Sequence, residues 1–133
     1  MTIRYAVPAD VPALSAVEAE CFPPAEAATA AEFVERVTHY GNHFWLMYDA
    51  DKLISFVDGF VTDNADLTDE MYENAAMHNE NGAWQMIFGV NTLPAYRQHG
   101  YAGKLLQKAI ADAKEQGRKG LVLTCKSRLV HYY

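Results

Sequence analysis

The residues best suited to chemistry form a short turn with two glycines, residues 97–103 (RQHGYAG). An apolar run, residues 84–90, precedes the turn, and a helical pattern, residues 104–113, follows it. The first turn of a helix presents backbone N–H groups without partners and a partial positive charge. The glycines lack a Cβ, so an anion can approach the backbone, and the arginine adds a forked cation. This order of elements predicts a phosphate site, and a cofactor with a diphosphate group is the leading hypothesis.

Two other phosphate-binding motifs do not fit the turn. A dinucleotide fingerprint needs a glycine two positions ahead of Gly100, where the chain has Gln98. A P-loop needs Gly-Lys followed by Ser or Thr, whereas Gly103-Lys104 is followed by Leu105. The remaining alternative is that the glycines only permit a tight turn from strand to helix. The strand and helix patterns on either side favour cofactor binding over that alternative.

The composition indicates one soluble globular domain. The chain has 133 residues, of which 50% are hydrophobic and 21% charged, enough for one hydrophobic core. The formal net charge of -6 argues against nucleic acid as a principal partner, because binding to phosphate backbones relies on excess Lys and Arg. The acidic balance is compatible with attraction of a cationic amine.

Neither a membrane segment nor a metal site is expected. No apolar stretch approaches the roughly 20 residues of a membrane-spanning helix, and the amino terminus lacks a signal-peptide pattern. Cys21 and Cys125 match neither a disulfide scaffold nor a metal-ligand spacing, and the five histidines include no helix-spaced pair. We therefore expect a cytoplasmic protein with no membrane partner and no metal.

Helical and strand periodicities, together with capping residues, predict an alternation of elements. The polar residues 62–81 are interpreted as a solvated excursion between strands, with a lid over the substrate as the alternative. The expected elements are a strand at 2–6, a helix between Asp10 and Pro23, a helix between Thr29 and Gly41, a hairpin of strands at 44–48 and 53–61, a strand at 84–90, a helix at 101–116 and a strand at 120–125.

The last three elements determine the expected fold class. A strand, a helix and a strand of these lengths form a right-handed crossover whose two strands are parallel. Residues 84–90 are apolar nearly throughout, as in a central strand covered on both faces. The chain is therefore expected to be an α/β (α+β) protein with a single layer of mixed sheet.

The turn also resembles a known signature. Arg97-x-x-Gly100-x-Ala102 is similar to the Gln/Arg-x-x-Gly-x-Gly/Ala motif of the GNAT superfamily of acyl-CoA-dependent N-acyltransferases. The likeness covers nearly the whole chain and is nearest to bacterial relatives of the arylalkylamine N-acetyltransferases. It implies mainly antiparallel strands with a parallel pair at the cofactor site and helices on both faces. The other segments that carry it are residues 19–23, 88–90, 94–97 and 120–125.

By this resemblance the cofactor is acetyl-CoA. Backbone N–H groups of the turn would hold its pyrophosphate, and the main chain of residues 88–90 would pair with the pantetheine arm. The N–H of Val90 would polarise the thioester carbonyl, in a gap where this strand splays from the next. The expected cofactor-binding residues are Phe88, Gly89, Val90, Arg97, Gln98, His99, Gly100, Tyr101, Ala102 and Gly103.

Acyl transfer from a thioester to an amine needs a neutral amine, a stabilised oxyanion and a proton for the leaving thiolate. Residues 129–133 resemble the start of the family helix whose tyrosine acts as general acid, so Tyr133 is the catalytic candidate and Tyr132 the neighbouring alternative. Both tyrosines are otherwise interpreted as packing residues.

A general base is harder to identify. Trp84 and Met86 occupy the positions of two histidines in the animal arylalkylamine enzymes, and they would instead line an apolar acceptor pocket. His78, Glu80 or a chain of water molecules could replace the histidines, although a lone histidine in a polar segment is more often exposed.

The resemblance implies an acetyl-CoA-dependent N-acetyltransferase that acts on a small primary amine by direct attack in a ternary complex. The alternatives are a protein or peptide N-acetyltransferase and a non-catalytic CoA-binding domain. Family members continue past the tyrosine into a final hairpin. Residues 1–133 are therefore interpreted as one GNAT domain truncated at its carboxy terminus, and a homodimer is hypothesised to cover the open strand.

Overall fold

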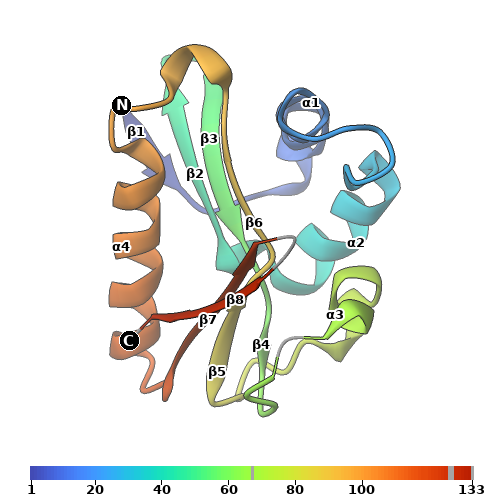
Figure 1. Cartoon of the computed structure of the whole chain (residues 1–133), viewed down its shortest axis with the longest axis vertical. Helices are drawn as coiled ribbons and strands as arrows, with labels where there is room; N and C mark the ends of the chain where they lie inside the picture. Colours follow the sequence, from blue (N-terminus) through green and yellow to red (C-terminus); the bar gives the residue numbers. More distant parts are fainter. Residues whose placement is uncertain (67, 126–127, 133) are drawn as a thin grey trace.

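The computed structural model describes residues 1–66, 68–125 and 128–132. The helices of this part of the chain lie on both faces of a central sheet (Figure 1). They are α1 (Val11–Cys21), α2 (Ala30–Tyr40), α3 (Asp69–Glu73) and α4 (Tyr101–Glu115). The Thr29 capping box is present, since Glu32 N donates to Thr29 Oγ1 at 3.2 Å and Thr29 N donates to Glu32 Oε1 at 3.0 Å.

Hydrogen bonds divide the sheet into two four-stranded parts. The first part is antiparallel throughout, in the order β1-β2-β3-β6. It contains β1 (Thr2–Arg4), β2 (Phe44–Asp49), β3 (Lys52–Asp58) and β6 (Gly89–Thr92). The expected hairpin is the β2–β3 pair.

The second part has the order β4-β5-β7-β8. It contains β4 (Val61–Thr62), β5 (Trp84–Ile87), β7 (Gly120–Cys125) and β8 (Arg128–Tyr132). The β5 and β7 strands are parallel. Between them the chain runs through β6, the turn at 97–100 and α4. The parallel pair and the mixed α/β fold expected from the sequence are therefore confirmed.

The apolar run at 84–90 is one path of chain that has β4 and then β3 on one side and loses its other neighbour, β7, at Phe88. Before this residue, β5 pairs with β7 as far as Ile87 and Leu123. At the break, Phe88 N donates to the carbonyl of Asp58 at 2.7 Å, and β6 then pairs with β3. Within the described ranges no ladder joins β6 to β7, so a gap opens between them.

A corresponding break divides the expected strand at 53–61. Gly59 separates β3 from β4, and a Cβ at this glycine would lie 1.8 Å from the carbonyl oxygen of Met86. Only a residue without a side chain permits the two backbones to approach this closely. The break in one strand therefore depends on a glycine opposite the break in the other.

The two faces of the sheet are covered by different helices. The Trp45 indole donates to Asp112 of α4, whereas the neighbouring Phe44 ring packs on Phe33 of α2. Because side chains alternate along a strand, successive residues of this strand point to opposite faces of the sheet. Figure 1 shows α4 on one side of the sheet and the amino-terminal helices on the other.

Two expectations need correction. Residues 129–133 were expected to begin a helix, but Arg128–Tyr132 forms β8, which pairs with the edge of β7 and uses its free backbone groups. The polar segment at 62–81 is more than a solvated excursion, since Met71 is 1% exposed and the Tyr72 ring lies 4.9 Å from that of Phe88.

We predict that Asp112→Ala will lower the free energy of unfolding by about 2–3 kcal/mol, because the buried indole N–H of Trp45 would lose its acceptor. Asp112 accepts hydrogen bonds from Trp45 Nε1 at 2.8 Å, Tyr5 OH at 2.7 Å and Lys108 Nζ at 3.0 Å. Urea unfolding followed by circular dichroism measures the change. Glu115→Ala, at an exposed position of the same helix, is the control and should change stability by less than about 0.5 kcal/mol.

Candidate functional site

The turn before α4 has the geometry of an anion site. Gly100 is the N-cap with a left-handed φ of 77°, and Gln98 also has a positive φ of 67°. The first helical hydrogen bond runs from Lys104 N to Gly100 O at 3.1 Å, so the amides of residues 101–103 have no intrahelical acceptor. Cβ positions built at Gly100 and Gly103 have no described atom within 4 Å, so both glycines face open space.

A cleft of about 470 Å³ lies between this turn, the end of α1 and β6. The Arg97 side chain is anchored at its wall, where Nε donates to the carbonyl of Thr92 at 3.0 Å. Most of the expected cofactor residues line the cleft, and residues that the sequence did not point to join them. The lining residues are Val90, Arg97, Gln98, Gly100, Tyr101, Ala102 and Gly103, together with Cys21, Phe22, Thr92 and Tyr96.

The edge of β6 faces this cleft. Leu93 N donates to Ile54 O at 2.9 Å, and Val90 is opposite Val57 in the same antiparallel ladder. Alternate residues of such a ladder bond to the partner strand, so the main-chain groups of Val90 and Thr92 point away from β3. The Thr92 carbonyl accordingly accepts from Arg97 on the cleft side. The N–H of Val90 therefore points into the gap between β6 and β7.

Three expected cofactor residues lie outside the cleft lining. Phe88 is 8% exposed, and its ring lies 4.9 Å from that of Phe60. Gly89 faces the opposite side of the sheet, where a Cβ would lie 2.9 Å from Asp58 Oδ1. His99 is exposed, and its ring lies 5.5 Å from that of Tyr101. A cofactor can contact Phe88 and Gly89 only through their main chain.

Some of the catalytic and pocket candidates lie outside the described residues, and others are placed in or against the core. Tyr133 lies outside the described residues, and the same holds for the side chains of Tyr132 and Cys125. Met86 is fully buried within the hydrophobic core, so it does not line an acceptor pocket. Trp84 is partly buried and packs against that core.

A group of buried polar side chains lies near Gly89 on the face covered by α1 and α2. Arg36 Nη1 lies 3.3 Å from Asp58 Oδ2, and Asn91 Nδ2 donates to Glu18 Oε1 at 2.7 Å. Burial raises the pKa of Asp58 to about 7, although the neighbouring Arg36 cation acts in the opposite direction. The sequence analysis did not identify this group. Its only signal was a charged residue within an apolar helix stripe and another within an apolar strand.

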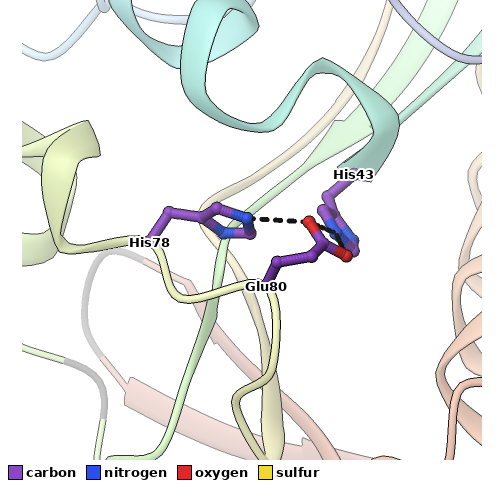
Figure 2. Close-up of side chains that lie close together, drawn as sticks. All are labelled: His43, His78 and Glu80. Atoms are coloured by element: carbon purple, nitrogen blue, oxygen red, sulfur yellow. Dashed lines mark hydrogen bonds and ion pairs between the residues drawn. The ribbon is translucent and has the colours of Figure 1, made fainter.

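A second polar group joins residues that are distant in the sequence, from the buried His43 to the exposed Glu80. His43 Nε2 lies 3.0 Å from both carboxylate oxygens of Glu80, and His78 Nε2 lies 2.9 Å from Oε1 (Figure 2). The Arg118 guanidinium also reaches this carboxylate, at 3.3 Å. His78 was expected to be exposed, but its side chain is only 8% exposed because it packs against Tyr40 and Phe60.

Two imidazoles and a carboxylate are also a donor set for Zn²⁺, and their ligand atoms all lie within 4.8 Å of one another. The tautomer of His78 argues against this use. Its Nδ1 accepts a hydrogen bond from Val61 N at 3.0 Å, so Nε2 carries the proton and has no lone pair for a metal. The cation of Arg118 beside Glu80 further weakens a metal site. The group fits a carboxylate held by hydrogen bonds better than a metal centre.

The chain belongs to the GNAT acetyltransferase family. The profile described as "Acetyltransferase (GNAT) family" matches residues 11–133. The resemblance inferred from the turn and its flanking elements is thus confirmed at the level of the family. A search of curated proteins finds no match.

Solved structures share the fold. The GphF GNAT-like decarboxylase in complex with isobutyryl-CoA is 29% identical, with a TM-score of 0.83 over 92% of this chain. The loading GNATL domain of CurA from Lyngbya majuscula is 20% identical, with a TM-score of 0.85 over 96% of this chain. This chain spans 65% of the length of each of these two structures. The ribosomal-protein-S18-alanine N-acetyltransferase from Escherichia coli is 17% identical, with a TM-score of 0.67 over 96% of this chain and 68% of its own.

Across the part of the chain that the structure describes, no helix combines the length and apolar character needed to cross a bilayer.

We predict that stability falls as the pH drops below about 6.5, because burial lowers the pKa of His78 from its ordinary value of 6.5. Below that value the unfolded chain takes up a proton that the folded ring resists, so this contribution is present above pH 6.5 and is lost below it. Thermal unfolding of His78→Asn between pH 7.5 and about 5 should show a smaller decrease in Tm than the wild type. His39→Asn, at an exposed position of α2, is the control and should keep the wild-type slope.

Proposed function

We propose that this chain binds acetyl-CoA in the cleft beside β6 and transfers the acetyl group to a primary amine of a small molecule. The observation that carries the proposal is the unpaired edge of β6, whose Val90 N–H points into a gap that ends at the amino terminus of α4. The pantetheine arm would extend along the cleft of about 470 Å³ beside β6, and the helix terminus offers amides to a pyrophosphate. Membership of the acetyltransferase family supports the same cofactor.

The chemistry follows from these positions. The Val90 N–H donates to the thioester carbonyl and stabilises the oxyanion that forms when the amine attacks. Tyr133 protonates the leaving thiolate, a role that still rests on the family resemblance. Acceptors on proteins are the alternative within the same reaction, since the fold is shared with a protein N-acetyltransferase. A cytoplasmic location, a bacterial source and a homodimer stay predictions from the sequence.

Isothermal titration with acetyl-CoA and a thiol-release assay over a panel of amines test the proposal together. We expect saturable binding and release of CoA thiol that requires both acetyl-CoA and an amine. Binding without release on any small amine or peptide would contradict the transferase function and favour a non-catalytic CoA-binding domain. Absence of binding at saturating acetyl-CoA would contradict the cofactor site itself.

We predict that Gly100→Val weakens acetyl-CoA binding at least about tenfold, because the side chain would stand where the phosphates approach. Gly117→Val is a matched control, since both glycines have φ of 77° and no described atom within 4 Å of a Cβ. Both variants carry the same backbone strain, roughly 1–3 kcal/mol, so both should lose similar stability. Titration calorimetry should show lost affinity in Gly100→Val alone; equal affinities in the two variants would contradict the site.

We predict that Tyr133→Phe lowers kcat about 10–100-fold without changing acetyl-CoA affinity, because it removes the proton donor and no binding contact. Thiol release and titration calorimetry measure the two quantities. Tyr132→Phe is the control for a one-residue shift in register. Turnover that falls only in the control would assign the role to Tyr132, and unchanged turnover in both would exclude a tyrosine acid here.

A second candidate function is decarboxylation of a CoA thioester that carries a carboxylate on its acyl group. The similarity to the GphF GNAT-like decarboxylase, 29% identical with a TM-score of 0.83, supports it. Within this chain, the buried Arg36 has an Nε with no hydrogen-bond partner among the described residues and offers a cation for such a carboxylate. Incubation with malonyl-CoA and chromatography for acetyl-CoA tests this function, and unchanged malonyl-CoA would exclude it for that substrate.

A further inference from the structure

The polar group beneath α1 and α2 lies directly against the proposed acyl site. A Cβ built on Gly89 would lie 2.9 Å from Asp58 Oδ1 and 3.6 Å from Asn91 Nδ2. Gly89 immediately precedes Val90, whose N–H marks the expected position of the thioester. Two polar side chains therefore flank the main chain at the one place where an acceptor must meet the acyl carbon.

The Asp58 carboxyl is held firmly in this position. Its Oδ2 lies 3.3 Å from Arg36 Nη1, and Arg36 Nη2 donates to the carbonyl of Tyr72 at 3.0 Å. The rings of Phe33 and Phe88 lie 5.5 and 5.8 Å from the guanidinium carbon. These contacts hold the Arg36 guanidinium in place, and its ion pair holds the Asp58 carboxyl in place.

The Asn91 side chain is fixed in the same way from α1. Its Nδ2 donates to Glu18 Oε1 at 2.7 Å, and Glu18 Oε2 accepts from Ala28 N at 2.8 Å. With the amide nitrogen oriented in this way, Asn91 Oδ1 is the acceptor that remains.

Several buried atoms here have unused hydrogen-bonding capacity. Among the described residues, Arg36 Nε, Tyr40 OH and Asn91 Oδ1 are buried without a hydrogen-bond partner. Buried polar atoms without partners are rare in folded proteins and indicate a ligand or water at the site. An ammonium group has three N–H donors, and Asn91 Oδ1 and the Asp58 carboxylate are two acceptors for it.

We propose that Asp58 is the general base of the acetyl transfer and receives a proton from the ammonium form of the acceptor, which Asn91 Oδ1 helps to orient. This inference rests on the proposed transferase function and names the binding site of its acceptor. It was not among the candidates from the sequence, which were His78, Glu80 and water.

The step balances without an additional reagent. The ammonium gives one proton to the Asp58 carboxylate, and the freed lone pair of the nitrogen forms a bond to the thioester carbon. The carbon–sulfur bond then breaks, and the thiolate leaves with its electron pair. Tyr133 gives its proton to that thiolate and is restored by the second proton lost by the nitrogen, and Asp58 returns its proton to solvent.

The electrostatic surroundings suit this role. Burial raises the pKa of Asp58 to about 7, so the carboxylate is a stronger base than an exposed aspartate and is still substantially ionised at neutral pH. The titratable and charged groups that act on it, within the described ranges, are Arg36 and Tyr40 from α2 and Glu18 from α1. Arg36 favours the charged carboxylate and Glu18 opposes it.

The decisive experiment compares Asp58→Asn with the wild type, using the most active amine of the panel. We expect kcat/KM to fall about 10²–10⁴-fold, while the affinity for acetyl-CoA stays within about twofold. The wild-type kcat/KM should rise with pH through about 7, and the variant should lose that rise. Asp51→Asn, the same substitution at an exposed position in the β2–β3 turn, should keep wild-type kinetics.

A second variant covers the case in which Asp58→Asn does not fold. Gly89→Ala keeps all charges and presses a Cβ to 2.9 Å from Asp58 Oδ1, so it should reduce kcat/KM at least about tenfold with acetyl-CoA still bound. If Asp58→Asn or Gly89→Ala keeps the rate and the pH profile of the wild type, the role of Asp58 is overturned. The transferase function would be left intact. A wild-type chain that releases no thiol with any amine would overturn both.

Discussion

The hydrogen bond from Phe88 N to the carbonyl of Asp58, 2.7 Å long, is the contact on which the functional architecture depends. It marks the point where the central strand keeps an antiparallel neighbour, passing from β4 to β3, but loses its parallel neighbour β7. Opposite it, Gly59 gives the backbone room to pass within reach of Met86. Without this loss of pairing, β6 and β7 would pair along their length and leave no gap. The free edge of β6 and the amino terminus of α4 could then not serve one ligand.

Beyond this point, successive residues of β6 face two different sets of surroundings. Val90 and Thr92 belong to the cleft beside α4, whereas Gly89 and Asn91 belong to the face beneath α1 and α2. Strand geometry makes this division unavoidable, because successive residues point to opposite sides. In the proposed reaction, a cofactor on one side meets the main chain of Val90, and the side chains at neighbouring positions point toward the acceptor on the other side.

Local patterns predicted much of the fold and of the turn that lines the cleft. The turn at Gly100, the capping box at Thr29 and the parallel pair around α4 all rest on short-range rules, and each is present. The prediction of a helix at 129–133 was wrong, because it was carried over from the family's continuation. In this structure the free edge of β7 takes up the segment as a strand.

The sequence by itself determined the class of fold and the position of the glycine turn before α4, because both depend on glycines and hydrophobic periodicity within a few residues of each other. Only the tertiary structure decided which charged residues meet. Arg36 and Asp58, and likewise His43, His78 and Glu80, are far apart in the chain and stand in unrelated local patterns. Their pairing comes from packing helices onto a sheet with a specific register. That register pairs the buried Arg36 with the buried Asp58, and either charge without its partner would be costly out of water.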